Sequence, residues 1–168
     1  FDFEIIMTSD KHLSGTDRIA EVVKEINEAN IIINIQGDEP LIDHKIIDSL
    51  VDAFKNKKIE MSTVISKKLL IEDLINSNIV KVLIDKKFNV INFKRKVLDL
   101  EIGRFYRHIG MYGFRRDTLF HFTSLPISKL EKKYNLEQMR AVENGIRIKA
   151  IITNFAHFSV DTKKDLMK

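Results

Sequence analysis

Residues 31–40 read Ile-Ile-Ile-Asn-Ile-Gln-Gly-Asp-Glu-Pro. The first five are almost continuously apolar and β-branched, which is typical of a strand covered on both faces in a largely parallel sheet. The Gly-Asp-Glu-Pro stretch that follows is a polar turn. The pattern therefore predicts a central strand whose carboxyl end carries an acidic loop.

Outward from this strand, the spacing of apolar residues predicts alternating strands and helices. Further strands are expected at 4–7, 61–66, 106–114 and 146–153, with a hairpin formed by 79–84 and 90–93. Helices are expected at 17–26, 43–55, 70–76, 135–144 and 162–167. This alternation predicts an α/β fold with three layers and a mixed, mostly parallel sheet. Ligands of such sheets collect beyond the carboxyl ends of the strands.

The composition fits a globular domain and excludes several classes of protein. The chain has 168 residues, of which 44% are hydrophobic, so we expect one domain over 1–168. A formal net charge of +4 is too small to favour nucleic acid as a partner. Without cysteine there is no disulfide, thiolate nucleophile or zinc-thiolate site. No apolar run reaches the roughly 20 residues that cross a bilayer, so we expect no membrane association and a cytoplasmic location.

The first residue is Phe1, and 4–7 already has the pattern of a strand. We therefore expect the chain to begin inside a fold, with its domain incomplete at the N-terminus.

The segment from His12 to Arg18, His-Leu-Ser-Gly-Thr-Asp-Arg, precedes a predicted helix and has two interpretations. Ser14 or Thr16 fits a helix N-cap, with an acidic residue in the first turn. The same turn also exposes N–H groups and hydroxyls at a helix N-terminus, a place suited to a nucleotide. The spacing favours neither interpretation.

Two acidic loops could hold a metal ion. Asp38 follows the apolar strand, and Asp161 lies in Val-Asp-Thr near the end of the chain. Each has an alternative structural role, Asp38 in a polar turn and Asp161 as the N-cap of the last helix. Together they would give two carboxylates at one edge of the sheet, the type of ligand that Mg²⁺ prefers beside phosphates.

Polar residues also occur in Arg-His-Ile-Gly-Met-Tyr at 107–112 and in Leu-Glu-Gln-Met-Arg at 136–140. A lone His108 or Tyr112 is more often structural than functional. Glu137 and Gln138 are offset from the apolar face of their predicted helix and could hydrogen-bond a polyhydroxylated ligand.

In this order, the five motifs resemble those of the 3-deoxy-manno-octulosonate cytidylyltransferase (CMP-Kdo synthetase) family. The resemblance runs from about His12 to Asp165 and implies a nucleotide-binding α/β fold like that of nucleotide-diphospho-sugar transferases. It also implies transfer of CMP from CTP to the acid sugar 3-deoxy-D-manno-octulosonate (Kdo), giving CMP-Kdo and pyrophosphate for lipopolysaccharide biosynthesis. The family uses Mg²⁺, and we expect a homodimer.

The resemblance also implies residue roles. Asp38 and Asp161 would be the catalytic magnesium ligands. Residues on the cytidine side would be His12, Ser14, Gly15, Thr16, Arg18 and Gln36. Residues holding the sugar acid would be Arg107, His108, Tyr112, Glu137 and Gln138.

The sequence departs from the family pattern at several places, including Tyr134, where the family usually has an acid, and Ser159, where it has a glycine. The family's basic N-terminal loop, which wraps the triphosphate, has no counterpart in residues 1–168, and 94–104 is shortened. Two alternatives therefore stay open, a non-catalytic remnant of the enzyme and a cytidylyltransferase for another acid sugar, such as a sialic-acid relative.

Overall fold

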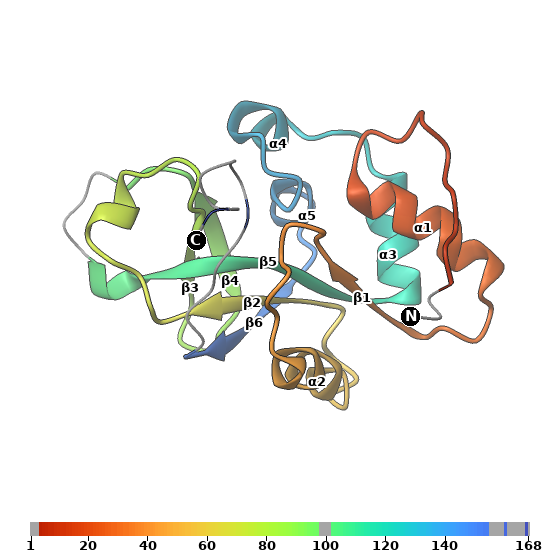
Figure 1. The fold of residues 1–168 in the computed structure, drawn as a ribbon, viewed down its shortest axis with the longest axis horizontal. Coiled ribbons are helices and arrows are strands. Elements are labelled where there is room, and N and C mark those ends of the chain that lie inside the picture. The colour runs from red at the N-terminus through yellow and green to blue at the C-terminus, as the bar shows by residue number, and fades with distance from the viewer. Residues whose placement is uncertain (1–3, 98–101, 155–159, 161–166, 168) are drawn as a thin grey trace.

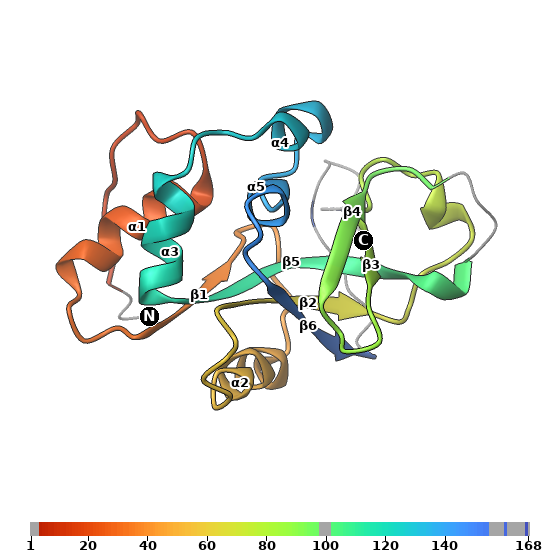
Figure 2. The same ribbon diagram turned by 180° about the vertical axis from the view of Figure 1, so that it is seen from behind.

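The computed structural model describes residues 4–97, 102–154, 160 and 167. Its helices are α1 (Gly15–Glu25), α2 (His44–Ala53), α3 (Arg116–Ser124), α4 (Lys129–Tyr134) and α5 (Met139–Glu143), with short 3-10 helices η1 (Glu72–Leu74) and η2 (Ile102–Arg104). Its strands are β1 (Ile31–Ile35), β2 (Met61–Ser66), β3 (Lys81–Ile84), β4 (Val90–Lys94), β5 (Phe105–Arg115) and β6 (Ile148–Thr153). Figures 1 and 2 show α1, α3, α4 and α5 over one face of the sheet and α2 over the other. The predicted three-layer α/β fold is confirmed.

Strand β5 organises the sheet, whose order is β4-β3-β5-β2-β6 with β1 also paired to β5. One edge of β5 pairs with β2. The other edge pairs first with β3 and then, near its end, with β1. Among the described strands only β2 and β6 run parallel, while the other four pairings are antiparallel. The sheet is mixed as predicted, but the expectation of mostly parallel pairing is wrong.

Strand β1 also differs from its prediction. In the described part of the chain it pairs with β5 alone, and its burial alternates, with Ile32 and Asn34 buried and Ile35 exposed. Ile32 packs into the core with residues of α1 and α3, whereas Ile33 is only partly buried against the cluster beneath α2. The two faces of β1 are therefore covered unequally, which continuous apolar character does not reveal.

Two apolar clusters hold the layers together, one on each face of the sheet. The larger lies under α1, α3 and α5 and includes Phe114, Phe122 and Met139, each at most 1% exposed. The smaller joins Ile46 and Leu50 of α2 to β2 and β5. Fully burying a side chain of this kind stabilises the fold by about 1.5–3 kcal/mol.

Other elements were predicted with mixed success. Helices at the positions of α1 and α2 and the β3–β4 hairpin are confirmed. The predicted strand 4–7 is wrong, because these residues have no regular structure. The predicted helix 135–144 is shorter, since Asn135 has a φ of 51° that ends α4, and α5 begins only at Met139. Helices α3 and α4 were not predicted.

The predicted helix 162–167 lies outside the described residues except for Met167. No helix in the described ranges is both long and apolar enough to cross a membrane.

A buried lysine ties the hairpin to the preceding loop. The ammonium of Lys81 is within 2.7 Å of the carbonyl oxygens of Asn76 and Ile79 and 2.5 Å from that of Arg95. Lys81 is 0% exposed, and burial lowers its pKa to about 8, with Asp73 acting against the shift. At neutral pH, its three protons can therefore meet three backbone acceptors.

We expect Lys81→Met to lower the free energy of unfolding by about 3 kcal/mol or more, because it leaves buried carbonyl groups without a donor. Urea denaturation at pH 7 measures the change. Lys86→Met, at an exposed residue of the hairpin turn, is the matched control and should change stability by less than about 0.5 kcal/mol. Equal stability of the two variants would contradict the role of Lys81.

Candidate functional site

The first part of the site is the N-terminus of α1. The Ser14 hydroxyl accepts a hydrogen bond from the Asp17 N–H at 3.1 Å and donates to the Asp17 carboxylate at 2.8 Å. Ser14 is thus the N-cap of α1, as the structural interpretation predicted. The cap fixes its hydroxyl at the helix end.

A line of side-chain amides joins this helix end to the loop after β1. The Asn34 amide donates to the Thr16 hydroxyl at 3.4 Å, and the Gln36 amide donates to Asn34 Oδ1 at 3.2 Å. Thr16 and Asn34 are both buried. The line therefore links the proposed cytidine-side residues Thr16 and Gln36 through Asn34, which the sequence analysis did not select.

The loop after β1 rests on a bulge in β5. Pairing between β2 and β5 shifts between Thr63 and Val64, which are opposite Tyr112 and Ile109, so Gly110 and Met111 are extra residues. A Cβ atom at Gly110 would lie 3.3 Å from the Gln36 side chain and 3.4 Å from Glu39 Oε1. Glycine therefore favours this close approach of strand and loop, since a Cβ atom would require the Gln36 side chain to shift by a few tenths of an ångström.

The Thr63 hydroxyl holds the bulge. It donates to the Met111 carbonyl at 2.9 Å and lies 2.9 Å from Nε2 of His108. Because the Thr63 proton is given to Met111, His108 Nε2–H is the donor to Thr63. The ring of His108 also contacts Phe93 edge-on, with centroids 5.3 Å apart.

Glu137 connects the helix end to the sugar-side residues. Burial raises the pKa of its carboxyl, and the neighbouring Ser14 and Thr16 hydroxyls oppose the rise. Its Oε1 is buried without a hydrogen-bond partner among the described residues. A carboxyl oxygen with unused bonding capacity beside two hydroxyls is a position where a polar ligand can be recognised.

Tyr112 lies close to this carboxyl. Burial raises the pKa of the Tyr112 phenol well above its ordinary range, and the nearby Glu137 charge adds to the rise. The rings of His108 and Tyr112 have centroids 5.4 Å apart. Gln138 is buried at the start of α5. Four of the five proposed sugar-side residues, His108, Tyr112, Glu137 and Gln138, therefore lie on the face of the sheet covered by α1, α3, α4 and α5, or in the chain packed on that face.

Arg107 is the exception. It precedes His108 on β5, and successive strand residues point to opposite faces. Its guanidinium is 3.8 Å from the Asp73 carboxylate, and its main chain is paired with Lys81. The structure thus separates Arg107 from the other proposed sugar-side residues.

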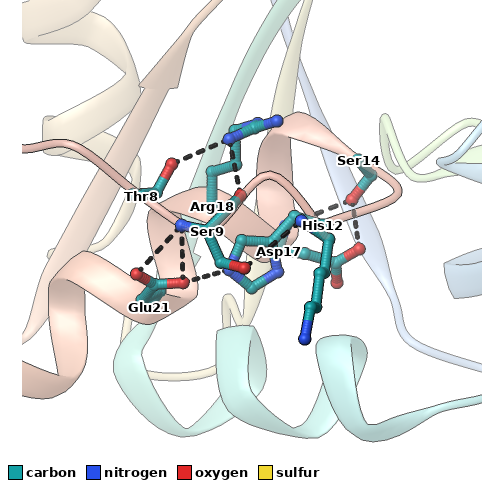
Figure 3. Close-up of polar contacts among 8 residues, drawn as sticks. Thr8, Ser9, His12, Ser14, Asp17, Arg18 and Glu21 are labelled. Atoms are coloured by element: carbon teal, nitrogen blue, oxygen red, sulfur yellow. Dashed lines mark hydrogen bonds and ion pairs between the residues drawn. The ribbon is translucent and has the colours of Figure 1, made fainter.

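The side chains of His12 and Arg18 bind other parts of the chain. His12 is hydrogen-bonded to Glu21 on α1, and Arg18 contacts the chain at Thr8 and Ser9 (Figure 3). Both side chains are engaged in holding the segment before α1.

The acidic edge is described in part. Asp38 is exposed, and its carbonyl accepts a hydrogen bond of 2.9 Å from the Val160 N–H. Asp161 lies outside the described residues, but Val160 is the residue before it. The backbone of Val160 therefore contacts the loop that carries Asp38. Among the described residues there is no cluster of three or more acidic or histidine side chains that could hold a metal.

Sequence reasoning missed Asn34, Thr63 and the role of Gly110. The signals were a polar residue within an apolar strand and a glycine within another, both of which are unfavourable unless a local contact requires them. Nothing in the sequence pointed to Thr63, since threonine is common in strands.

Comparison with known proteins identifies the family. A model of the cytidylyltransferase family matches residues 1–148. The chain belongs to the cytidylyltransferase family. This cytidylyltransferase also has relatives that match nearly its whole length and are named for one reaction.

Two such relatives are 3-deoxy-manno-octulosonate cytidylyltransferases. The protein from Thermodesulfovibrio yellowstonii is 42% identical and is matched over 99% of this chain and 72% of its own length. The protein from Fusobacterium nucleatum subsp. nucleatum is also 42% identical, over 99% of this chain and 70% of its own. The chain thus spans about seven tenths of these relatives.

Solved structures agree. A CMP:2-keto-3-deoxy-manno-octonic acid synthetase complexed with CTP is 32% identical, with a TM-score of 0.88 over 96% of this chain and 68% of that one. The inositol-1-phosphate CTP transferase from T. maritima, at 17% identity, has a TM-score of 0.58 over 91% of this chain and 58% of that one and shows the fold alone. The predicted family and fold are confirmed.

We expect Glu137→Gln to be more stable than the wild type near neutral pH, by about 1 kcal/mol. A carboxyl whose pKa is raised by folding stabilises the protein below its unfolded pKa and loses that contribution as the pH rises through the folded value. The amide variant avoids this loss, so urea denaturation from pH 4 to 8 should show the difference growing with pH. The exposed Glu28→Gln is the control, and a constant or reversed difference for Glu137→Gln would contradict the burial of its charge.

Proposed function

We propose that this cytidylyltransferase transfers CMP from CTP to Kdo and forms CMP-Kdo and pyrophosphate for lipopolysaccharide biosynthesis. The relatives named above and the CTP-bound neighbour support this substrate pair. The observation that carries the proposal is the buried Glu137 carboxyl, whose Oε1 has no hydrogen-bond partner among the described residues and whose pKa responds to the Ser14 and Thr16 hydroxyls of the cytidine side.

On the cytidine side, Ser14, Gly15, Thr16 and Gln36 are the proposed contacts. Gly15 leaves space there, since a Cβ atom would approach Gln36 Oε1 only to 3.9 Å. The amide line through Asn34 fixes the Gln36 side chain before any ligand arrives. Groups fixed in advance lose little conformational entropy on binding.

On the sugar side, His108, Tyr112, Glu137 and Gln138 are the proposed contacts. Glu137 and Tyr112 offer a carboxyl and a hydroxyl to a polyhydroxylated acid. The binding of the sugar carboxylate by Arg107 stays a prediction. Because Arg107 lies on the other face of β5, its side chain would reach the sugar around the end of the strand.

The reaction needs alignment more than acid–base chemistry by the protein. The anomeric hydroxyl oxygen of Kdo forms a bond to the α-phosphorus of CTP, and the bond to the pyrophosphate oxygen breaks. The proposed cytidine-side and sugar-side contacts would bring these two atoms together and exclude water.

Asp38 and Asp161 are the proposed ligands of Mg²⁺. The exposed Asp38 carboxylate fits a hard cation that takes most of its other oxygens from phosphates and water. The contact between Val160 and Asp38 supports a shared edge for the two acidic loops. When bound, Mg²⁺ would offset the negative charge of the phosphates.

Three further properties are part of the proposal. Residues 1–168 would belong to a single cytidylyltransferase domain, and the protein would work in the cytoplasm, where CTP is available. It would form a homodimer, for which exposed apolar side chains such as Leu70, Ile71 and Ile75 offer a surface, at 61%, 69% and 64% exposure. A monomer mass in light scattering would contradict the dimer.

The reaction is tested by pyrophosphate release. With CTP, Kdo and Mg²⁺ the protein should release pyrophosphate, and chelation of the metal should abolish it. Asp38→Asn should lower kcat by about 100-fold or more, since it removes a charge next to the phosphates. Asp48→Asn, at an exposed site on α2, should not.

A second variant tests the contact between loop and bulge. Gly110→Ala should lower kcat/KM by about 10-fold to 100-fold, because the methyl group displaces Gln36 and Glu39 from the site. Gly103→Ala, where a Cβ would meet nothing within 4 Å, is the control. Equal kinetics of the two variants would contradict the placement of Gln36 in the site.

The outcomes separate the alternatives. Turnover of a sialic-acid relative but not of Kdo would identify a different sugar specificity. Saturable CTP binding without turnover of either sugar, or no binding at all, would favour a non-catalytic remnant. Both results would overturn the proposed reaction.

A further inference from the structure

The segment before α1 is fastened to that helix by two of its side chains. Both Glu21 carboxylate oxygens accept from the Ser9 N–H, at 3.3 and 3.4 Å. The Arg18 guanidinium donates to the Ser9 carbonyl and to the Thr8 hydroxyl, each at 2.9 Å. The two backbone polar groups of Ser9 are therefore both bound by side chains of α1, as Figure 3 shows.

His12 completes this arrangement. Its Nε2 is hydrogen-bonded to Glu21 Oε2, and because a carboxylate can only accept, Nε2 carries the proton. The bond from His12 lowers the pKa of the Glu21 carboxyl, and the Ser9 N–H adds to the effect. Glu21 is therefore a charged acceptor at neutral pH, and one carboxylate holds the chain at two places.

These side chains make the hydrogen bonds that attach the segment to α1. The described backbone-to-backbone bonds of turns and loops include none made by residues 4–13. Within the segment, the Lys11 N–H donates to the Ser9 hydroxyl at 3.2 Å, a local bond that does not attach it to the rest of the fold. Its position relative to α1 therefore depends on Arg18 and Glu21.

The same segment leads directly into the proposed cytidine-side residues. Ser14 lies two residues after His12, and its hydroxyl, which donates to the Asp17 carboxylate, also influences the pKa of Glu137. Arg18 and Glu21 are three residues apart and share one face of α1, while the buried residues Thr16, Ala20 and Val23 face the core. The helix thus presents one set of side chains to the core and another to the segment.

We propose that Glu21 is a positioning residue for CTP, which with His12 and Arg18 holds residues 8–12 against α1 so that Ser14 and Gly15 keep their places. The inference rests on the proposed function, and it adds Glu21, which is not one of the proposed ligand contacts. It also gives His12 and Arg18 a different role, since their polar groups are directed to Glu21, Thr8 and Ser9 and reach the nucleotide only through the segment.

The experiment compares Glu21→Ala and Glu21→Gln with Glu25→Ala, a change at an exposed residue of the same helix. Glu21→Ala should raise the KM for CTP by about 10-fold or more and leave kcat at saturating CTP and the KM for Kdo near the wild-type values. Glu21→Gln keeps an oxygen acceptor for Ser9 and should recover part of the loss. Glu25→Ala should behave as the wild type.

Amide hydrogen exchange provides a readout that does not depend on nucleotide. The Ser9 amide should exchange faster in Glu21→Ala, while amides of β2 and β5 stay protected. In the wild type the same amide should lose protection only below the ordinary pH range of glutamate titration, because the lowered pKa keeps Glu21 charged to a lower pH.

The outcomes distinguish this inference from the proposed function. Unchanged Ser9 exchange in Glu21→Ala, or an unchanged KM for CTP in a variant that still turns over, would overturn the positioning role and leave the reaction intact. A wild-type protein that binds no CTP would overturn the proposed function itself. A fall in kcat with both KM values unchanged would also contradict a role in holding the CTP segment.

Discussion

The site depends on the irregular pairing of β5 with β2. Two extra residues at Gly110 and Met111 would leave the ladder open, and the Thr63 hydroxyl closes it by bonding to the Met111 carbonyl and to His108. The bulge turns a residue without a side chain toward the loop after β1, and Gln36 and Glu39 occupy that space. One backbone irregularity therefore sets the position of both the loop and the His108 ring.

Glu137 shows why the two halves of the site need each other. A buried carboxyl without full hydrogen bonding is unfavourable, and the Ser14 and Thr16 hydroxyls at the start of α1 compensate it only in part. Such a group is retained where a ligand supplies the missing partner, and the resulting loss of stability is typical of binding sites. The raised pKa, the unused oxygen and the meeting of two motifs thus have one explanation.

Much of the architecture could be read from the sequence, because local patterns report local forces. The apolar periodicity of α1 and α2 and the turn of the β3–β4 hairpin are local, and they were predicted. The direction of strand pairing is not local. Ile31–Ile35 has the composition of a parallel central strand, yet its described partner β5 runs antiparallel to it, and no residue within β1 encodes that choice. Helix α4 was missed although its capping box between Ser128 and Glu131 is a local signal, while the buried pair between Glu131 and Arg140 of α5, whose atoms are 2.7 Å apart, is a contact that no local pattern reports.

The same limit applies to the site residues. Ser14 satisfied both of its interpretations, since the cap that explains it structurally also fixes its hydroxyl beside Glu137. His12 and Arg18 lie in the same motif, but their direct contacts are with Glu21 and Thr8. A motif shows which residues act together, but it does not separate those that face a ligand from those that hold the others in place. That distinction comes from the direction of each side chain, and here Glu21, which lies outside every motif, accounts for the direction of His12.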